Sequence, residues 1–138
     1  MVDNDYVLVD TSAWIASFRS SVPEDLKAFL NQALANRRVV TAPIITLELL
    51  QGTKTQHEYG DLKLMLESLG QLPMNLAVWN RSYALGFTLR RNGLTIPTTD
   101  VIIAALALEY DCALLHRDRH FRMIQSFVDL KTVEFPTS

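Results

Sequence analysis

Residues 6–9 form a continuous apolar run, Tyr-Val-Leu-Val, that ends abruptly at Asp10. Continuous runs of this kind, rich in β-branched residues, are typical of strands buried on both faces of a parallel sheet. Residues 38–42 and 113–115 predict two more buried strands, and residues 132–135 predict a last strand at the sheet edge. A sheet of such strands needs helices on both of its faces.

Helical periodicity and capping residues fill the segments between these strands. The predicted helices span residues 13–19, 24–36, 43–52, 56–69, 77–92 and 101–110. A short additional strand is predicted at residues 73–76. Strands that alternate with helices favour an α/β fold with a mainly parallel sheet and helices on both sides.

The 138 residues contain no linker, repeat or low-complexity stretch, which predicts one domain over residues 1–138. Cys112 is the one cysteine, so an internal disulfide is excluded, and we expect it to pack in the core. The N-terminus has acids where a signal peptide would have lysines, and no apolar run approaches the ~20 residues of a membrane helix. These features predict a cytoplasmic protein without a membrane partner.

The net charge of −2 does not indicate a broadly basic, nucleic-acid-binding surface. Arginines nevertheless occur in clusters, at positions 37–38, 90–91 and 117–122. Acids gathered in one metal site would lower the net charge and leave basic rims for phosphate contacts. The alternative for each cluster is an ordinary solvated face.

Four carboxylates occupy unusual positions in this pattern. Asp10 ends the first strand, and Asp118 comes three residues after the strand at 113–115. Glu48 lies in the helix that follows the second strand, and Asp100 begins a helix with no other charge until Glu109. All four therefore lie near the carboxyl edge of the sheet, where parallel sheets bind ligands.

Each acid also has a structural interpretation. Asp10 and Asp100 suit helix capping, and Asp118 could form a surface ion pair. Glu48 is flanked by leucines and isoleucines, so we expect it to lose solvent and to need a cation or several hydrogen-bond donors.

Taken together, four converging acids are best explained by a hard divalent cation. Oxygen ligands favour Mg²⁺ or Mn²⁺, whereas zinc is disfavoured because Cys112 has no thiol partner and histidines are few. We expect the three histidines, His57, His116 and His120, at the surface or the rim rather than as ligands.

Such a site performs phosphodiester hydrolysis. The chain has no G-x-x-x-x-G-K-[ST], G-x-G-x-x-G or G-x-S-x-G motif, which disfavours nucleotide-fuelled, dinucleotide and acyl-transfer chemistry.

Four motifs in order carry a family resemblance: VDTS at 9–12, Glu48 with Gly52 four residues later, TDVIIAA at 99–105 and LHRDRHF at 115–121. Together they resemble the PIN-domain family, and most closely its VapC-like ribonuclease toxins. The resemblance covers residues 6–134. It implies a three-layer α/β/α sandwich and a Mg²⁺- or Mn²⁺-dependent endoribonuclease.

The same resemblance implies roles for individual residues. Asp10 and Asp100 would be the most direct metal ligands, and Glu48 and Asp118 would complete the metal's surroundings or act through water. Hydroxyl groups would orient the two aspartates, with helix capping as the alternative: Ser12 and Thr11 for Asp10, and Thr99 for Asp100.

Basic residues near the fourth motif, Arg117, Arg119 and Arg122, would hold substrate phosphates or neutralise the rim. Many family members carry an acid where this chain has His120, which leaves open one metal ion or two, although a neutral histidine can bind Mn²⁺. The implied partners are an RNA substrate, an antitoxin protein whose extended tail covers the toxin groove, and a second copy in a homodimer.

Three other interpretations remain possible from the pattern of acids. A haloacid-dehalogenase-like phosphatase needs an aspartate where Ser12 stands. A receiver domain needs an acidic pair before the end of the first strand and a suitably placed late lysine, which Lys131 does not provide. A PIN-like binding module would have lost one or more acids, and all four are present.

Overall fold

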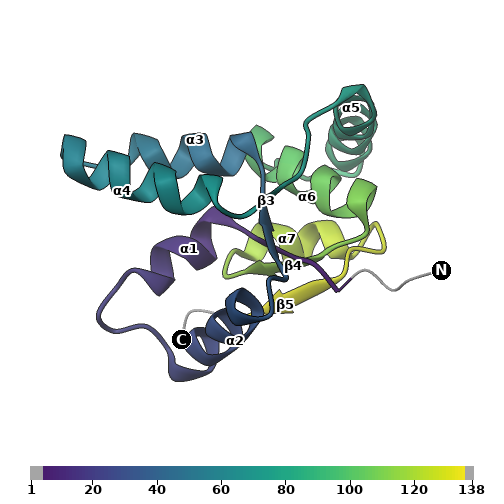
Figure 1. Ribbon diagram of the computed structural model, residues 1–138. Helices are drawn as coiled ribbons and strands as arrows, with labels where there is room; N and C mark the ends of the chain where they lie inside the picture. Colours follow the sequence, from purple (N-terminus) through teal and green to yellow (C-terminus); the bar gives the residue numbers. More distant parts are fainter. Residues whose placement is uncertain (1–4, 136–138) are drawn as a thin grey trace.

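The computed structural model describes residues 5–135, so the ends of the predicted domain, residues 1–4 and 136–138, lie outside the described residues. The elements follow one another as β1 (Val7–Val9), α1 (Thr11–Ser17), α2 (Glu24–Ala35), β2 (Val39–Thr41), α3 (Pro43–Gln51), α4 (Gln56–Glu67), β3 (Gly70–Gln71), α5 (Leu76–Arg91), α6 (Thr98–Tyr110), β4 (Ala113–His116), α7 (Arg119–Gln125) and β5 (Thr132–Glu134) (Figure 1).

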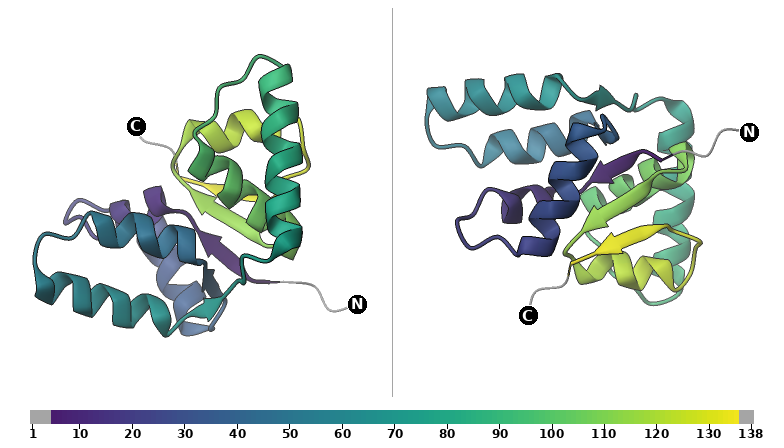
Figure 2. Two further views of the ribbon diagram at one scale, coloured as in Figure 1. Left: turned by 90° about the horizontal axis from the view of Figure 1, so that it is seen from above. Right: turned by 60° about the horizontal axis from the view of Figure 1, so that its bottom comes forward.

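The five strands form one parallel sheet in the order β3-β2-β1-β4-β5. Helices α1–α4 gather on one side of it and α5–α7 on the other (Figure 2). The predicted α/β fold with helices on both faces is confirmed. β1 lies at the centre of the sheet and is almost entirely buried, with Val7 1% exposed and Leu8 and Val9 0%, because it is covered on both faces.

Helix α6 forms the apolar centre of one layer. Its residues Val101 to Ala107 are all buried, and it packs against α5, β4 and α7. The predicted packing of Cys112 is confirmed, since this residue is 2% exposed just before β4. None of the helices between residues 5 and 135 combines the length and apolar character that a membrane crossing requires.

The predicted strand at residues 73–76 is wrong. The third strand is β3, at Gly70–Gln71, where Gly70 pairs with Val40 and Gln71 with Thr41. A Cβ at Gly70 would lie 3.1 Å from the Val40 side chain, so glycine permits this close pairing. Pro73 cannot donate a backbone hydrogen bond, which explains why pairing stops before it.

Helix α7 has no counterpart among the predicted elements. It is a short helix capped by Asp118, and its own residues Phe121 and Ile124 are fully buried. The predicted boundaries elsewhere are close to those observed. The first helix starts at Thr11 rather than Ala13, and α6 starts at Thr98 rather than Val101.

Candidate metal centre

Asp10 follows β1 directly and is the N-cap of α1, so capping and site placement go together. Its backbone is extended and its Oδ2 accepts the N–H of Ser12 at 3.0 Å. The Ser12 hydroxyl donates to the same oxygen at 2.5 Å. These two hydrogen bonds fix the carboxylate at the carboxyl end of the central strand.

The Ser12 hydroxyl also connects two strand ends. Its Oγ accepts the backbone N–H of Arg117, just beyond β4, at 3.0 Å. Because the oxygen accepts there, its single hydrogen is left for Asp10. Ser12 therefore holds Asp10 and the start of the β4–α7 loop at a fixed separation.

Asp100 reaches the same edge from the opposite layer. Helix α6 leads into β4, and its first turn lies at the carboxyl edge of the sheet. Asp100 sits in that turn and is only 9% exposed. The surrounding apolar helix offers it no charged neighbour of its own, so its partners come from α7.

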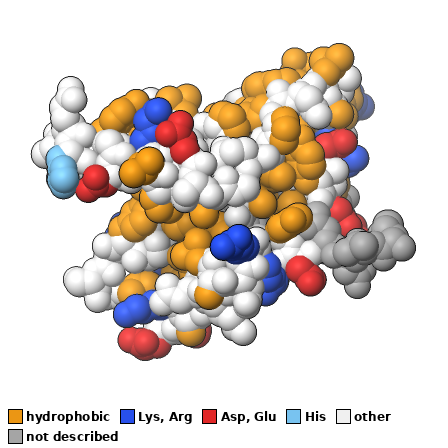
Figure 3. Space-filling view, in the orientation of Figure 1, with side chains coloured by type: hydrophobic (Ala, Val, Ile, Leu, Met, Phe, Trp, Pro, Cys, Tyr) orange, Lys and Arg blue, Asp and Glu red, His pale blue; other side chains and the backbone are white. Residues whose placement is uncertain are grey.

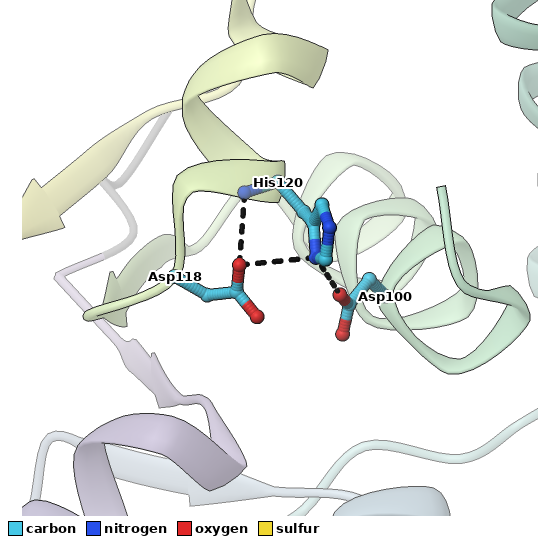
Figure 4. Close-up of side chains that lie close together, drawn as sticks. All are labelled: Asp100, Asp118 and His120. Atoms are coloured by element: carbon cyan, nitrogen blue, oxygen red, sulfur yellow. Dashed lines mark hydrogen bonds and ion pairs between the residues drawn. The ribbon is translucent and has the colours of Figure 1, made fainter. Parts of the chain in front are cut away.

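Asp118 and His120 supply those partners (Figure 4). Asp118 is the N-cap of α7, and its Oδ1 accepts the N–H of His120 at 2.9 Å. The His120 ring lies between the two carboxylates, with Nδ1 2.9 Å from Asp100 Oδ2 and 3.0 Å from Asp118 Oδ1. Two acids from distant parts of the sequence thus share one imidazole nitrogen.

The two most buried acids are strongly perturbed. Burial raises the pKa of Asp10 to about 6, against the opposing effect of its Ser12 hydrogen bonds, and the negative charge of Asp100 adds to the rise. Burial also raises the pKa of Asp100 to about 6, with the negative charges of Asp118 and Glu48 adding and the His120 contact opposing. The four acids therefore interact electrostatically, and a bound cation would relieve their repulsion.

Glu48 is placed differently from our expectation. It is half-buried on α3, while Leu47 beside it is 56% exposed, because a helix directs successive side chains to different faces. The expected loss of solvent is therefore partial, and apolar residues such as Ile15 and Phe18 line the same groove as Glu48. Thr11 donates to Glu48 Oε1 at 2.8 Å, so its hydroxyl contacts Glu48 and not Asp10.

The other predicted side chains are not all directed at the acids. Thr99 is half-buried, and its hydroxyl makes no hydrogen bond within residues 5–135. Arg117 Nε donates to the Phe135 carbonyl at 2.7 Å, and Arg122 Nε pairs with Glu134 at 3.1 Å. Arg119 is exposed, and in the described part of the chain it forms no ion pair.

His116 corrects a further expectation, because it is fully buried rather than at the rim. Its Nδ1 accepts the N–H of Asp118 at 3.2 Å, and its ring meets Phe121 at 5.1 Å between centroids. Burial lowers the pKa of His116, which keeps the ring neutral and able to accept. His116 thus supports the loop that carries Asp118. Because His116 directly follows the apolar run at 113–115, its position at the end of a buried strand is the sequence feature that indicates its burial.

Asp100, Asp118 and His120 have the donor set of a divalent metal site. Each offers one ligand atom, and the three atoms lie within 4.8 Å of one another. Carboxylate oxygens and an imidazole nitrogen suit Mn²⁺ and related divalent ions. The residues present therefore fit a divalent cation, with Asp10 and Glu48 adding negative charge beside them.

A groove of about 850 Å³ adjoins this site between α1 and the α3–α4 hairpin. Its walls include the apolar residues Ile15, Phe18 and Leu62, together with Glu48. Figure 3 shows apolar side chains gathered in the notch below the α3–α4 hairpin. Because Glu48 belongs to both features, the groove leads directly to the acids.

Fold and site together define an α/β sandwich with a carboxylate cluster at the carboxyl edge of its parallel sheet. The family model described as PIN domain matches residues 7–125, and the chain belongs to this family. The chain is 28% identical over 134 residues to VapC ribonuclease Mb1587 of Mycobacterium bovis, an alignment that covers 94% of this chain and 98% of that protein.

Solved structures share the fold. VapBC2 from Rickettsia felis, bound to a DNA fragment from its promoter, contains a chain with a TM-score of 0.78 and 16% identity, covering 94% of this chain and 98% of that chain. VapBC-1 from nontypeable Haemophilus influenzae gives a TM-score of 0.78 and 23% identity, covering 94% and 97%. At these identities the likeness concerns the fold alone.

Proposed function

We propose that this protein is a divalent-metal-dependent endoribonuclease and the toxin of a toxin–antitoxin pair. The observation that carries the proposal is the convergence of Asp10, Glu48, Asp100 and Asp118, two of them with a pKa raised to about 6, at the carboxyl edge of a PIN domain. The relative aligned over 94% of the chain bears the name ribonuclease.

Asp10, Asp100 and Asp118 would hold the cation, which is Mg²⁺ or Mn²⁺, with Glu48 completing the negative surroundings. When bound, the ion supplies Lewis-acid catalysis: it lowers the pKa of water and stabilises charge on the phosphodiester. Ser12 holds Asp10, and Thr11 holds Glu48. These hydroxyls orient the carboxylates for metal binding.

Arg119 is the arginine best placed to receive RNA. It lies between Asp118 and His120 in sequence and is exposed, whereas Arg117 and Arg122 are engaged by Phe135 and Glu134. An exposed guanidinium that forms no ion pair within residues 5–135 is free to provide a bidentate donor for phosphate. We assign it to substrate binding.

Solved structures of similar fold that are described as VapBC complexes support an assembly with a partner. We propose an antitoxin protein as partner, seated along the groove between α1 and the α3–α4 hairpin, and a homodimer of this chain. We also propose that residues 1–138 form one domain and that the protein acts in the cytoplasm.

The test is RNA cleavage by the purified, partner-free chain. Total bacterial RNA is incubated with Mn²⁺ or Mg²⁺, and new RNA ends are mapped. We expect discrete cuts that disappear with EDTA and in Asp10→Asn, and that persist in Asp129→Asn, the same substitution at an exposed aspartate. Metal binding without cleavage of any RNA would contradict the nuclease and leave a binding module.

A further inference from the structure

We propose that His120 is a metal ligand of this site and makes it select Mn²⁺ over Mg²⁺. The inference rests on the proposed metal-dependent function and adds a residue and an ion preference to it. The observation behind it is the position of His120 Nδ1, which contacts a carboxylate oxygen of α6 and one of the α7 cap at once.

The separations of His120 Nδ1 from the two carboxylate oxygens match those of neighbouring ligands on one ion, and all three ligand atoms lie within 4.8 Å of one another. His120 Nδ1 lies 2.9 Å from Asp100 Oδ2 and 3.0 Å from Asp118 Oδ1. Neighbouring ligands of an octahedral ion with bonds of about 2.1 Å are about 3 Å apart. An ion can therefore be accommodated between these atoms with little movement of the side chains.

The ring of His120 is held in this position by the start of α7. Its backbone N–H is bound by Asp118 Oδ1 at 2.9 Å, and the next residue, Phe121, is fully buried. The His120 side chain is 25% exposed and that of Asp100 13%. The fold thus places the imidazole among the acids before any ion arrives.

His57 shows that this arrangement differs from an ordinary histidine–carboxylate pair. Its Nε2 lies 3.2 Å from Asp61 one helical turn along α4, with side chains 87% and 72% exposed. That pair involves one carboxylate and lies in solvent. His57 is therefore a matched control for His120.

Ligand chemistry gives the ion preference. Mg²⁺ takes oxygen ligands and gives up its waters reluctantly. Mn²⁺ also suits carboxylates but, as a transition-metal ion, accepts an imidazole nitrogen more readily than Mg²⁺ does. A nitrogen in an otherwise carboxylate site therefore favours Mn²⁺ over Mg²⁺. An aspartate at position 120 would provide only oxygens and remove this preference.

The test uses the full-length chain, free of metal and partner. Mn²⁺ binding is titrated calorimetrically, Mg²⁺ is added as competitor, and pulsed electron paramagnetic resonance detects nitrogen bound to Mn²⁺. We expect Mn²⁺ to bind at least ~10-fold more tightly than Mg²⁺ and to show directly coordinated nitrogen. In His120→Gln we expect the nitrogen signal to disappear and Mn²⁺ affinity to fall ~10-fold or more.

Two variants sharpen the result. His120→Asp should bind both ions with a much smaller preference for Mn²⁺, and His57→Gln should behave like the wild-type protein. Mn²⁺ bound without coordinated nitrogen would overturn the role of His120 and leave the proposed nuclease intact. Failure of the wild-type chain to bind either ion would overturn both. The nitrogen signal of the wild-type chain decides the question even if a variant fails to fold.

Discussion

The acidic site has two sides that are built differently. On the α1 side, Asp10 and Glu48 each accept a hydroxyl hydrogen bond, from Ser12 and Thr11 respectively. On the α7 side, Asp100 and Asp118 share the ring nitrogen of His120. The first side uses fixed neutral donors, and the second uses a group that can also bind metal.

This difference teaches how a fold can hold several acids together. Hydroxyl and backbone donors stabilise a carboxylate whether or not a cation is present. An imidazole nitrogen contacts both carboxylates but occupies a position that an ion can take. We therefore expect the α1 side to remain rigid on metal binding and the α7 side to rearrange its hydrogen bonds.

The largest expected effect comes from removing one charge on either side. Asp10→Asn and Asp100→Asn should each lower metal-dependent RNA cleavage by more than ~100-fold, because losing a ligand exceeds the 10–100-fold typical of supporting residues. Initial rates of cleavage measure this. A substantial residual rate in one variant would show that its side is dispensable and would contradict the expectation that both sides are needed for cleavage.

Supporting hydroxyls should have smaller and unequal effects. Ser12→Ala removes the hydrogen bonds to both Asp10 and Arg117, so we expect a 10–100-fold loss of metal affinity and about 1–3 kcal/mol of stability. Thr11→Val removes only the hydrogen bond to Glu48 and should cost less in both. Calorimetric titration measures the metal affinity of each variant, and urea unfolding measures its free energy of unfolding. Equal effects would argue against the bridging role of Ser12.

The metal-free protein should lose stability as pH rises through about 6. Asp10 and Asp100 have a pKa raised from 3.8 to about 6, so the folded state holds their protons more tightly than the unfolded state. Their contribution is fully present below about pH 4 and lost above the folded pKa, on the order of 2–3 kcal/mol for each.

Thermal unfolding in EDTA tests this prediction. At pH 8, Asp10→Asn and Asp100→Asn should melt higher than the wild-type protein, and the difference should shrink toward pH 4. A difference that stays constant with pH would show that the two carboxyls titrate normally in the folded protein.

The smallest effect concerns the arginines of α7. Arg119→Ala should raise KM for RNA a few-fold and weaken its salt dependence, because an exposed cation available to the phosphates of RNA is lost. Arg122→Ala should change KM less than twofold, because the Arg122 guanidinium is already paired with Glu134. Cleavage rates over a range of salt concentrations compare the two. A larger effect at Arg122 would reverse the assignment.

Much of the fold was predictable because its elements carry local signals. The buried strands β1, β2 and β4 appear as apolar runs, and α6 as an apolar helix after Pro97. The position of β3 differs from the predicted strand at 73–76. Two exposed residues that pair only through backbone groups show no hydrophobic pattern in the sequence. Helix α7 was missed because it is short and its polar residues resemble a loop.

The sequence by itself determined the α/β class, the strands that end in acids and the edge at which those acids meet, because periodicity and strand direction are local properties. Tertiary structure alone decided which partner each acid has. Thr11 donates a hydrogen bond to Glu48. Ser12 accepts the N–H of Arg117, which is 105 residues away in sequence. His120 contacts Asp100, 20 residues away, as well as Asp118. Such contacts depend on how helices from opposite layers are brought together, and no local pattern encodes that packing.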